Sequence, residues 1–281
     1  MKIGIIGNGF VGNAIHENLK WFYKTTVYDT NPELSNCKSI SEVTKQTDCI
    51  FVSVPTPMHM DGSPDLSIIF DVMENIAESY NDNIIILKST VVPGTSREII
   101  KRFPSLKLVF SPEFLTEANA IGDFKSCNRM IFGGVLEDAQ VCIDMMKKVF
   151  PEKEYKITDW ETAETVKYYI NAFLATKVSF ANEMKQICDV TDTNYNEVRD
   201  LALLDNRIGK SHLQVPGPDG FHGFGGKCFA KDLNALMYFG TLNNIKPTML
   251  QAAWQKNLEV RETKDWLNIK GAVTKGEDYE Q

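Results

Sequence analysis

The chain has no long hydrophobic run, since none of its apolar stretches approaches the ~20 residues that a membrane-spanning helix needs. Cysteine is sparse, and the six cysteines form neither a CxxC pair nor a zinc-binding spacing, so no metal is expected. Acidic residues outnumber basic ones, 37 to 30, and a net charge of −7 does not indicate a nucleic-acid partner. The first residues enter a strand pattern without a signal peptide. We therefore expect a cytoplasmic protein with reduced cysteines that binds neither membranes nor nucleic acids.

A GxGxxG motif follows the first expected strand, residues 2–6, and precedes an amphipathic helix over about 11–21. In a dinucleotide-binding turn these glycines make the turn, admit the pyrophosphate and let helix and strand pack closely. Asp29 ends the next strand, at the ~20-residue interval of the acid that binds the adenosine ribose. Because its carboxylate would repel a 2′-phosphate, we expect NAD rather than NADP. The alternative, a glycine turn that binds no ligand, does not explain why all these features occur in order.

Strands alternate with helices through the N-terminal half, which predicts an α/β fold with a Rossmann-type, doubly wound parallel sheet over residues 1–159. Further strands are expected at 48–54, 83–88, 106–110 and 129–132, and helices at 65–80, 95–103 and 137–150. In such sheets ligands bind at the carboxyl ends of the strands, where this chain places Thr56, Ser89, Thr90, Glu113 and Glu117. Thr90 could equally be a turn cap, and Glu113 a solvated loop charge.

The pattern changes to helices only over residues 160–267, which we expect to form a second, helical domain. One long helix over 160–190 has apolar residues on nearly every face, which predicts that it is buried. Lys167 and Asn171 lie one turn apart in it; a lysine there is either used or reaches the surface. Helices are also expected at 194–204, 233–242 and from 247 to about 266, followed by a polar tail over 268–281.

The segment GFGGKCFAKD, residues 223–232, places three glycines before a cysteine. Cys228 stands between two lysines at a possible helix start, where a thiolate is favoured. Asp232 follows it by four residues, so both would face one side of a helix. The alternative is a glycine-rich loop that leads into a helix carrying a buried cysteine.

Seven separate stretches resemble one family, the nucleotide-sugar dehydrogenases of the UDP-glucose 6-dehydrogenase and GDP-mannose 6-dehydrogenase type. They occur in family order over residues 1–261: GIIGNGFVG with Asp29, VSVPTP, KSTVVPGT, SPEFLTEANA, ETVKYYINAFLATKVSFANE, DNRIG and GFGGKCFAKD. The chain departs from the pattern in its length, which indicates a short form without the second, C-terminal nucleotide-binding domain. The stretch VPGPDGFHG is also longer than in the commonest members.

The resemblance implies an NAD-dependent, four-electron oxidation of the C6 alcohol of a nucleotide sugar, with UDP-glucose to UDP-glucuronate as the expected reaction. Cys228 would attack the C6 aldehyde and form a thiohemiacetal and then a thioester. Lys167, with Asp232 and a water, would manage the first proton, and Asn171 would donate a hydrogen bond to the same oxygen. Glu113 would assist thioester hydrolysis and Thr90 would hold the water.

The resemblance also implies a cofactor site, a sugar site and a homodimer formed through the long helix, with Arg207 reaching the partner's site. The expected cofactor-binding residues are Gly7, Gly9, Phe10, Val11, Gly12, Asp29, Val54, Pro55, Thr56, Thr90, Glu117 and Lys231. The expected substrate-binding residues are Glu113, Phe114, Leu115, Glu117, Lys167, Asn171, Arg207, Phe224 and Gly225. Two alternatives remain open: a two-electron dehydrogenase of the β-hydroxyacid or 6-phosphogluconate type, and a non-catalytic protein that binds NAD or a nucleotide sugar.

Overall fold

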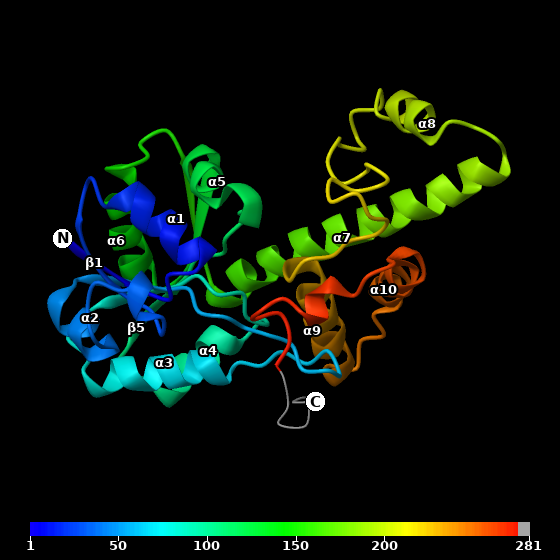
Figure 1. The fold of residues 1–281 in the computed structure, drawn as a ribbon. Coiled ribbons are helices and arrows are strands. Elements are labelled where there is room, and N and C mark those ends of the chain that lie inside the picture. The colour runs from blue at the N-terminus through cyan, green and yellow to red at the C-terminus, as the bar shows by residue number, and fades with distance from the viewer. Residues whose placement is uncertain (275–281) are drawn as a thin grey trace. The chain divides into compact units, whose positions relative to one another are not determined.

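The computed structural model describes residues 1–274, which form two compact units (Figure 1). Unit 1 comprises residues 1–56 and 66–167, and unit 2 comprises residues 57–65 and the chain from Tyr168 onward. Of the expected polar tail, residues 275–281 lie outside the described part.

Unit 1 is built on a seven-stranded sheet in the order β2-β1-β3-β4-β5-β6-β7. The strands are β1 (Lys2–Ile6), β2 (Lys24–Tyr28), β3 (Cys49–Val52), β4 (Ile84–Leu87), β5 (Lys107–Phe110), β6 (Arg129–Gly134) and β7 (Glu154–Thr158). Pairing is parallel from β2 to β5, which confirms the predicted α/β sheet. β6 is antiparallel to β5 and parallel to β7, so the last two strands differ from the all-parallel expectation. An antiparallel pair needs no crossover helix.

Helices cover both faces of this sheet (Figure 1). They are α1 (Phe10–Leu19), α2 (Ile40–Gln46), α3 (Ser67–Glu78), α4 (Thr95–Arg102), α5 (Ala120–Ser126), α6 (Leu136–Lys147) and the first two turns of α7 (Trp160–Val190), with short turns η1 (Pro32–Leu34) and η2 (Glu117–Asn119). The sequence patterns above do not predict α2, α5 or β7, which are short segments without a strong apolar period.

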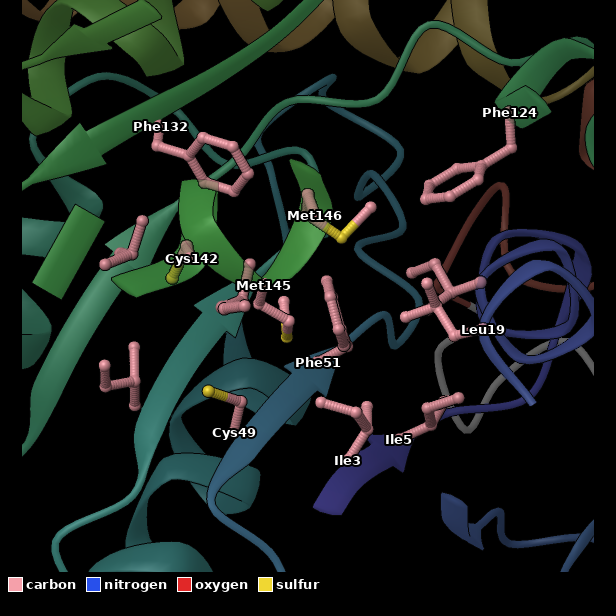
Figure 2. Close-up of a cluster of buried hydrophobic side chains, with 14 of the residues drawn as sticks. Ile3, Ile5, Leu19, Cys49, Phe51, Phe124, Phe132, Cys142, Met145 and Met146 are labelled. Atoms are coloured by element: carbon pink, nitrogen blue, oxygen red, sulfur yellow. The ribbon is translucent and has the colours of Figure 1, made fainter. Parts of the chain in front are cut away.

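The core follows the two-residue period of the strands, because successive side chains point to opposite faces of a sheet. On β3, Cys49 and Phe51 pack with helices α1, α5 and α6, the cluster drawn in Figure 2. Ile50 and Val52, the alternate residues, pack with helices α2, α3 and α4 on the other face. β4 divides in the same way. Strands buried on both faces hold their carboxyl ends rigidly, and the candidate catalytic side chains of unit 1 follow those ends.

Unit 2 consists of helices together with the segment 57–65 from the N-terminal half of the chain. Its elements are α7 from Tyr168 onward, α8 (Tyr195–Ala202), α9 (Cys228–Leu242), α10 (Thr248–Val260) and the short turn η3 (Asp265–Leu267). Ala172 and Ala175 of α7 pack with α9 and α10 around Leu233 and Phe224. α9 begins at Cys228, five residues before the expected start, and α10 ends at Val260 because the next residue has an extended backbone.

Residues 57–65 belong to unit 2, although we expected all of residues 1–159 in the first domain. Met58 packs against Ala230, Trp266 and Ala272, and its backbone N–H donates to the carbonyl oxygen of Ala272 at 3.0 Å. Part of the expected tail is therefore folded, since Ala272 is fully buried. The interaction pairs segments more than 200 residues apart, which no local pattern predicts.

The boundary of unit 1 falls inside α7, after Lys167, because the start of this helix is bound to the sheet unit. The indole of Trp160 donates to the carbonyl oxygen of Leu108 at 2.9 Å. The carboxylate of Glu164 accepts the N–H groups of Gly94 and Ser96, at 2.6 and 2.8 Å, at the start of α4. These bonds satisfy donors that a helix N-terminus leaves without intrahelical partners.

The composition of α7 predicts a helix that is buried on every face, but the structure leaves one face exposed. Four exposed large apolar side chains of this helix are spaced four and seven residues apart: Tyr169 (73%), Phe173 (57%), Phe180 (60%) and Ile187 (49%); Val190, at its end, is also exposed. This spacing places them on one stripe of the helix. A stripe of this size is unusual for a surface that faces only water.

Candidate active site

The glycine turn between β1 and α1 has the geometry that a dinucleotide needs. Gly7 has φ of +86°, a conformation that favours glycine. A Cβ on Gly12 would overlap the carbonyl oxygen of Gly7, whereas one on Gly9 would meet nothing within 4 Å. α1 begins without a side-chain cap at Gly9. Such a helix start binds a pyrophosphate, and the residues present therefore fit NAD.

Asp29, at the end of β2, lies beside this turn. One carboxylate oxygen accepts the backbone N–H of Asn8 at 2.7 Å and the other accepts that of Asn31 at 2.8 Å. Each oxygen keeps a further lone pair that can accept a ribose hydroxyl. The end of β3 contributes Val54, Pro55 and the buried Thr56, as expected for the cofactor side of the sheet.

Replacing Asp29 by asparagine should weaken NAD binding by about tenfold, because a charge-assisted hydrogen bond is worth ~1.5–3 kcal/mol. The preference for NAD over NADP should also fall, since the repulsion of a 2′-phosphate is removed. Titration calorimetry with both cofactors measures the two effects. Glu33→Gln, an exposed carboxylate in η1, is the matched control and should bind NAD as the unaltered protein does.

A buried ion pair lies beyond the end of β5, where the Lys167 ammonium donates to Glu113 Oε1 at 2.8 Å and to the Glu113 carbonyl oxygen at 2.8 Å. The two side chains are only 4% and 7% exposed. This burial excludes both alternatives, a solvated Glu113 and a lysine that reaches the surface. Glu113 Oε2 also accepts the backbone N–H of Leu115 at 2.8 Å. The Lys167 ammonium stands 5.9 Å from the ring centre of Phe114.

The pKa of Glu113 is lowered. Burial by itself raises the pKa, but the charge and hydrogen bond of Lys167, the Leu115 N–H and the charge of Lys88 outweigh it. Glu113 is therefore an anion at neutral pH and can accept a proton. Lys88 is absent from the sequence prediction; its only sequence signal is a lysine directly after an apolar strand.

Two further predicted site residues of unit 1, Thr90 and Glu117, differ in their exposure to solvent. Thr90 is 9% exposed and follows Ser89, whose hydroxyl donates to the Val54 carbonyl oxygen at 2.8 Å. The structure thus places Thr90 at the end of β4, the strand next to β5. Glu117 is exposed in the turn η2.

A second cluster belongs to unit 2. Cys228 is the first residue of α9 and is partly exposed, where the N–H groups of the helix start favour a thiolate. Asp232, one turn later, is 1% exposed. Its carboxylate accepts the amide N–H of Asn171 at 2.6 Å and the ammonium of Lys231 at 2.5 Å. Lys231, which we expected at the cofactor, is bound to Asp232 in this structure.

α7 contributes one residue to each cluster. Lys167 and Asn171 stand four positions apart on this continuous helix, and both are buried. A buried lysine and a buried asparagine are costly unless paired. Here each is bound to a carboxylate, that of Glu113 and that of Asp232 respectively.

Comparison with known proteins identifies the family of the chain. Residues 16–153 match the NAD binding domain of the UDP-glucose/GDP-mannose dehydrogenase family, and residues 161–259 match its central domain. The chain belongs to this family. The UDP-glucose 6-dehydrogenase of Rickettsia bellii (strain RML369-C) is 35% identical over 254 residues, which cover 87% of this chain and 53% of the relative. The chain thus spans about half the length of that dehydrogenase.

Two further comparisons place the fold within the nucleotide-sugar dehydrogenases. The putative UDP-glucose 6-dehydrogenase YtcA of Bacillus subtilis (strain 168) is 34% identical, with 92% of this chain and 67% of the relative covered. A UDP-glucose dehydrogenase from Pyrobaculum islandicum superposes with a TM-score of 0.82 at 27% identity, covering 92% of this chain and 68% of that one. A 3-hydroxyisobutyrate dehydrogenase from Mycobacterium tuberculosis reaches a TM-score of 0.74 at 15% identity, which shows the fold alone.

In this family member the glycine-rich loop before Cys228 is braced by α10 and η3. The fully buried Asn257 accepts the N–H of Phe224 at 2.7 Å and donates to its carbonyl oxygen at 3.0 Å. Asp265 accepts the N–H of Gly226 at 2.8 Å. The guanidinium of Arg261 lies where a Cβ on Gly225 would be. Sequence reasoning missed these bracing residues, because they lie ~30–40 positions beyond the loop and carry no local motif.

Phe224, which we expected at the substrate, is a buried residue of the glycine-rich loop. Its ring is buried against Phe229 and Trp254, and both of its backbone polar groups are bound to Asn257. It is therefore a core residue that anchors the loop. The side chain of Arg207 is 89% exposed and is paired with Asp205 at 2.5 Å.

Asn257→Ala should lower the free energy of unfolding by about 2 kcal/mol, because two buried backbone groups of Phe224 lose their partner. Urea denaturation measures the change. Gln251→Ala, an exposed residue of the same helix, is the control and should stay within about 0.5 kcal/mol of the unaltered protein. Equal stability of the two variants would contradict the bracing role.

No helix among residues 1–274 is both long and apolar enough to cross a membrane. In the same part of the chain, no group of three or more His, Cys, Asp or Glu side chains is arranged to hold a metal ion.

Proposed function

We propose that the protein is an NAD-dependent nucleotide-sugar 6-dehydrogenase that oxidises a C6 alcohol to a carboxylate, with UDP-glucose as substrate and UDP-glucuronate as product. The observation that carries the proposal is the placement of Cys228 at the start of α9, one turn from a buried Asp232 bound to Asn171 at 2.6 Å. The relatives named UDP-glucose 6-dehydrogenase support this choice of substrate. NAD, when bound, takes one hydride from C6 in each of two oxidations.

In the first oxidation, the C6 hydroxyl loses its proton as a hydride leaves the carbon, and an aldehyde results. We assign the proton to a water held by Lys167 and Asp232, and the stabilisation of the developing negative oxygen to Lys167 and Asn171. α7 supports this shared role, because it carries one of these residues in each cluster. The Lys167 ammonium and the Asn171 amide nitrogen both carry N–H groups that can donate hydrogen bonds to an oxyanion.

The Cys228 thiolate then adds to the aldehyde carbon and gives a thiohemiacetal. Loss of the hydroxyl proton to water and of the second hydride from this carbon leaves a thioester. A water, held by Thr90 and deprotonated by Glu113, attacks the thioester carbonyl and releases the carboxylate and the thiolate. Burial acts to raise the pKa of Glu113, but the charge of Lys167 lowers it by more. The lowered pKa keeps this base ionised.

Purified protein incubated with NAD and a panel of UDP- and GDP-sugars tests this function. We expect NADH with UDP-glucose, at two equivalents per sugar consumed. One equivalent would indicate a two-electron dehydrogenase of the β-hydroxyacid type. No NADH with any sugar, together with measurable NAD binding by calorimetry, would indicate a protein that binds and does not catalyse.

We also propose a homodimer, formed through the exposed stripe of α7, and a cytoplasmic location. A second copy of the chain would cover Tyr169, Phe173, Phe180 and Ile187, and large apolar patches commonly mark such interfaces. The exposed Arg207 would then be free to reach the partner. All six cysteines are thiols, which suits a reducing compartment.

Phe180→Glu should convert the dimer to a monomer. In the dimer each chain would bury one unpaired carboxylate in the apolar interface, which is costly. Light scattering after size-exclusion chromatography gives the mass. The control is Met249→Glu on α10, which replaces another exposed apolar residue (71%) outside α7 and should leave the mass unchanged. A protein that is monomeric before any substitution would refute the proposed interface.

A further inference from the structure

Lys88 is a buried cation that the proposed mechanism does not use. It directly follows β4 and is 7% exposed. Its ammonium donates to the Ser111 hydroxyl at 3.2 Å and to the Pro112 carbonyl oxygen at 2.9 Å. Both acceptors immediately precede Glu113, at the end of the neighbouring strand β5. Lys88 therefore joins the carboxyl ends of two strands through its side chain.

The charges around Lys88 are those of the proposed active site. Burial lowers the pKa of Lys88 to about 8, the charges of Glu113 and Cys127 oppose this change, and the charge of Lys167 adds to it. Glu113 thus has two buried lysines near it, of which only Lys167 donates to its side chain. One lysine would suffice to neutralise one carboxylate, and a second buried cation is costly unless it serves a purpose.

The geometry indicates that purpose. Thr90 lies two positions after Lys88, and Glu113 lies two positions after Ser111. In the proposed reaction these two residues hold and deprotonate the hydrolytic water. A bond from Lys88 to the Ser111–Pro112 segment fixes the spacing of the two strand ends from which they project. If Lys167 gives up its proton during the first oxidation, the Lys88 ammonium still provides a positive charge near Glu113.

We propose that Lys88 is a positioning residue that ties the Ser111–Glu113 segment to the end of β4 and keeps a second positive charge beside the Glu113 carboxylate. The inference rests on the proposed function for the reaction that it serves, and on unit 1 alone for its geometry. A lysine with a merely structural role would contribute to stability and leave the ionisation of Glu113 unchanged. The two roles therefore differ in a measurable quantity.

The test compares Lys88→Met, which removes the charge and both bonds, with Lys88→Arg, which keeps the charge. The control is Lys153→Met, because the Lys153 ammonium also binds carbonyl oxygens, those of Phe124 and Lys125 at 2.9 Å and that of Cys127, and is not among the charges that shift the pKa of Glu113. The first readout is the pH profile of product release under saturating UDP-glucose and NAD. In Lys88→Met, the pH below which product release slows should rise by about one unit. Thioester should accumulate below that pH. Lys88→Arg should restore the profile of the unaltered enzyme.

The second readout needs no activity. Carbon-13 NMR of the Glu113 carboxyl, assigned by Glu113→Gln, follows its titration in each variant without substrate. A raised midpoint in Lys88→Met and an unaltered midpoint in Lys153→Met support the proposal. An unaltered midpoint in both, or an equal pH profile for Lys88→Met and the unaltered enzyme, overturns it. If Lys88→Met does not fold, Lys88→Gln, which keeps a donor and loses the charge, is titrated instead. A failure of the proposed function would abolish NADH formation in the unaltered enzyme and leave the NMR result standing.

Discussion

Cys228→Ser should reduce formation of the carboxylate product by on the order of 1,000-fold or more, because a serine hydroxyl at neutral pH is a far weaker nucleophile than a thiolate. The first oxidation needs no thioester, so aldehyde or a stalled adduct should accumulate. NADH should then approach one equivalent per sugar instead of two. Quenched-flow product analysis, with NADH absorbance as the second signal, measures both quantities.

NAD affinity separates this chemical effect from a damaged fold. Cys228→Ser changes one atom at a partly exposed position at the start of α9, so we expect the same dissociation constant for NAD. Cys188→Ser, a thiol buried in the contact of α7 with α8, is the control and should retain full turnover. A fully active Cys228→Ser enzyme would exclude the covalent mechanism.

Lys167→Met should have the largest effect on stability, since it leaves the Glu113 carboxylate buried without the ammonium that binds it at 2.8 Å. Breaking one side of a buried ion pair costs about 3–5 kcal/mol. Urea denaturation at pH 7 gives the loss in the free energy of unfolding. The double variant Lys167→Met, Glu113→Gln should recover part of it, because no uncompensated charge remains buried.

The pH dependence of this loss follows from the sign of the shift. In the unaltered protein the pKa of Glu113 is lowered: burial acts to raise it, and the Lys167 charge more than offsets burial. The resulting stability is present above the unfolded pKa and is lost as the pH falls through the folded pKa. In Lys167→Met burial dominates, so the folded pKa rises and the variant gains stability as the pH falls. The difference between the two proteins should therefore shrink from pH 7 towards pH 5. A difference that is constant over this range would show that Glu113 is not the group responsible.

Local patterns predict the sheet unit well because its signals are short-range. The alternation of Cys49 and Phe51 with Ile50 and Val52 sets the strand and both of its faces. The glycines of the first turn are required by a positive φ at Gly7 and by close packing at Gly12. Helical spacing places Lys167 and Asn171 on one face of the long helix and the family resemblance gives them a role, while the structure shows that both are buried.

Errors arise where residues distant in sequence interact. Residues 57–65 join the helical unit because Met58 packs on Ala230 and Ala272, and Phe224 is withdrawn from the surface by Asn257. The long helix is apolar all round in composition, yet one of its faces lies exposed, because composition does not say which face finds a partner within the chain.

By itself, then, the sequence determined the α/β class, the cofactor turn and the chemically competent residues, since each depends on backbone preference or spacing within a few turns. Only the tertiary structure decided which of those residues meet: Lys167 with Glu113, Asn171 with Asp232, and Lys88 with the turn before Glu113. The physical reason is that a buried charge is tolerated only beside its counter-charge. That neighbour is supplied by another strand or helix, at a sequence distance no local pattern records.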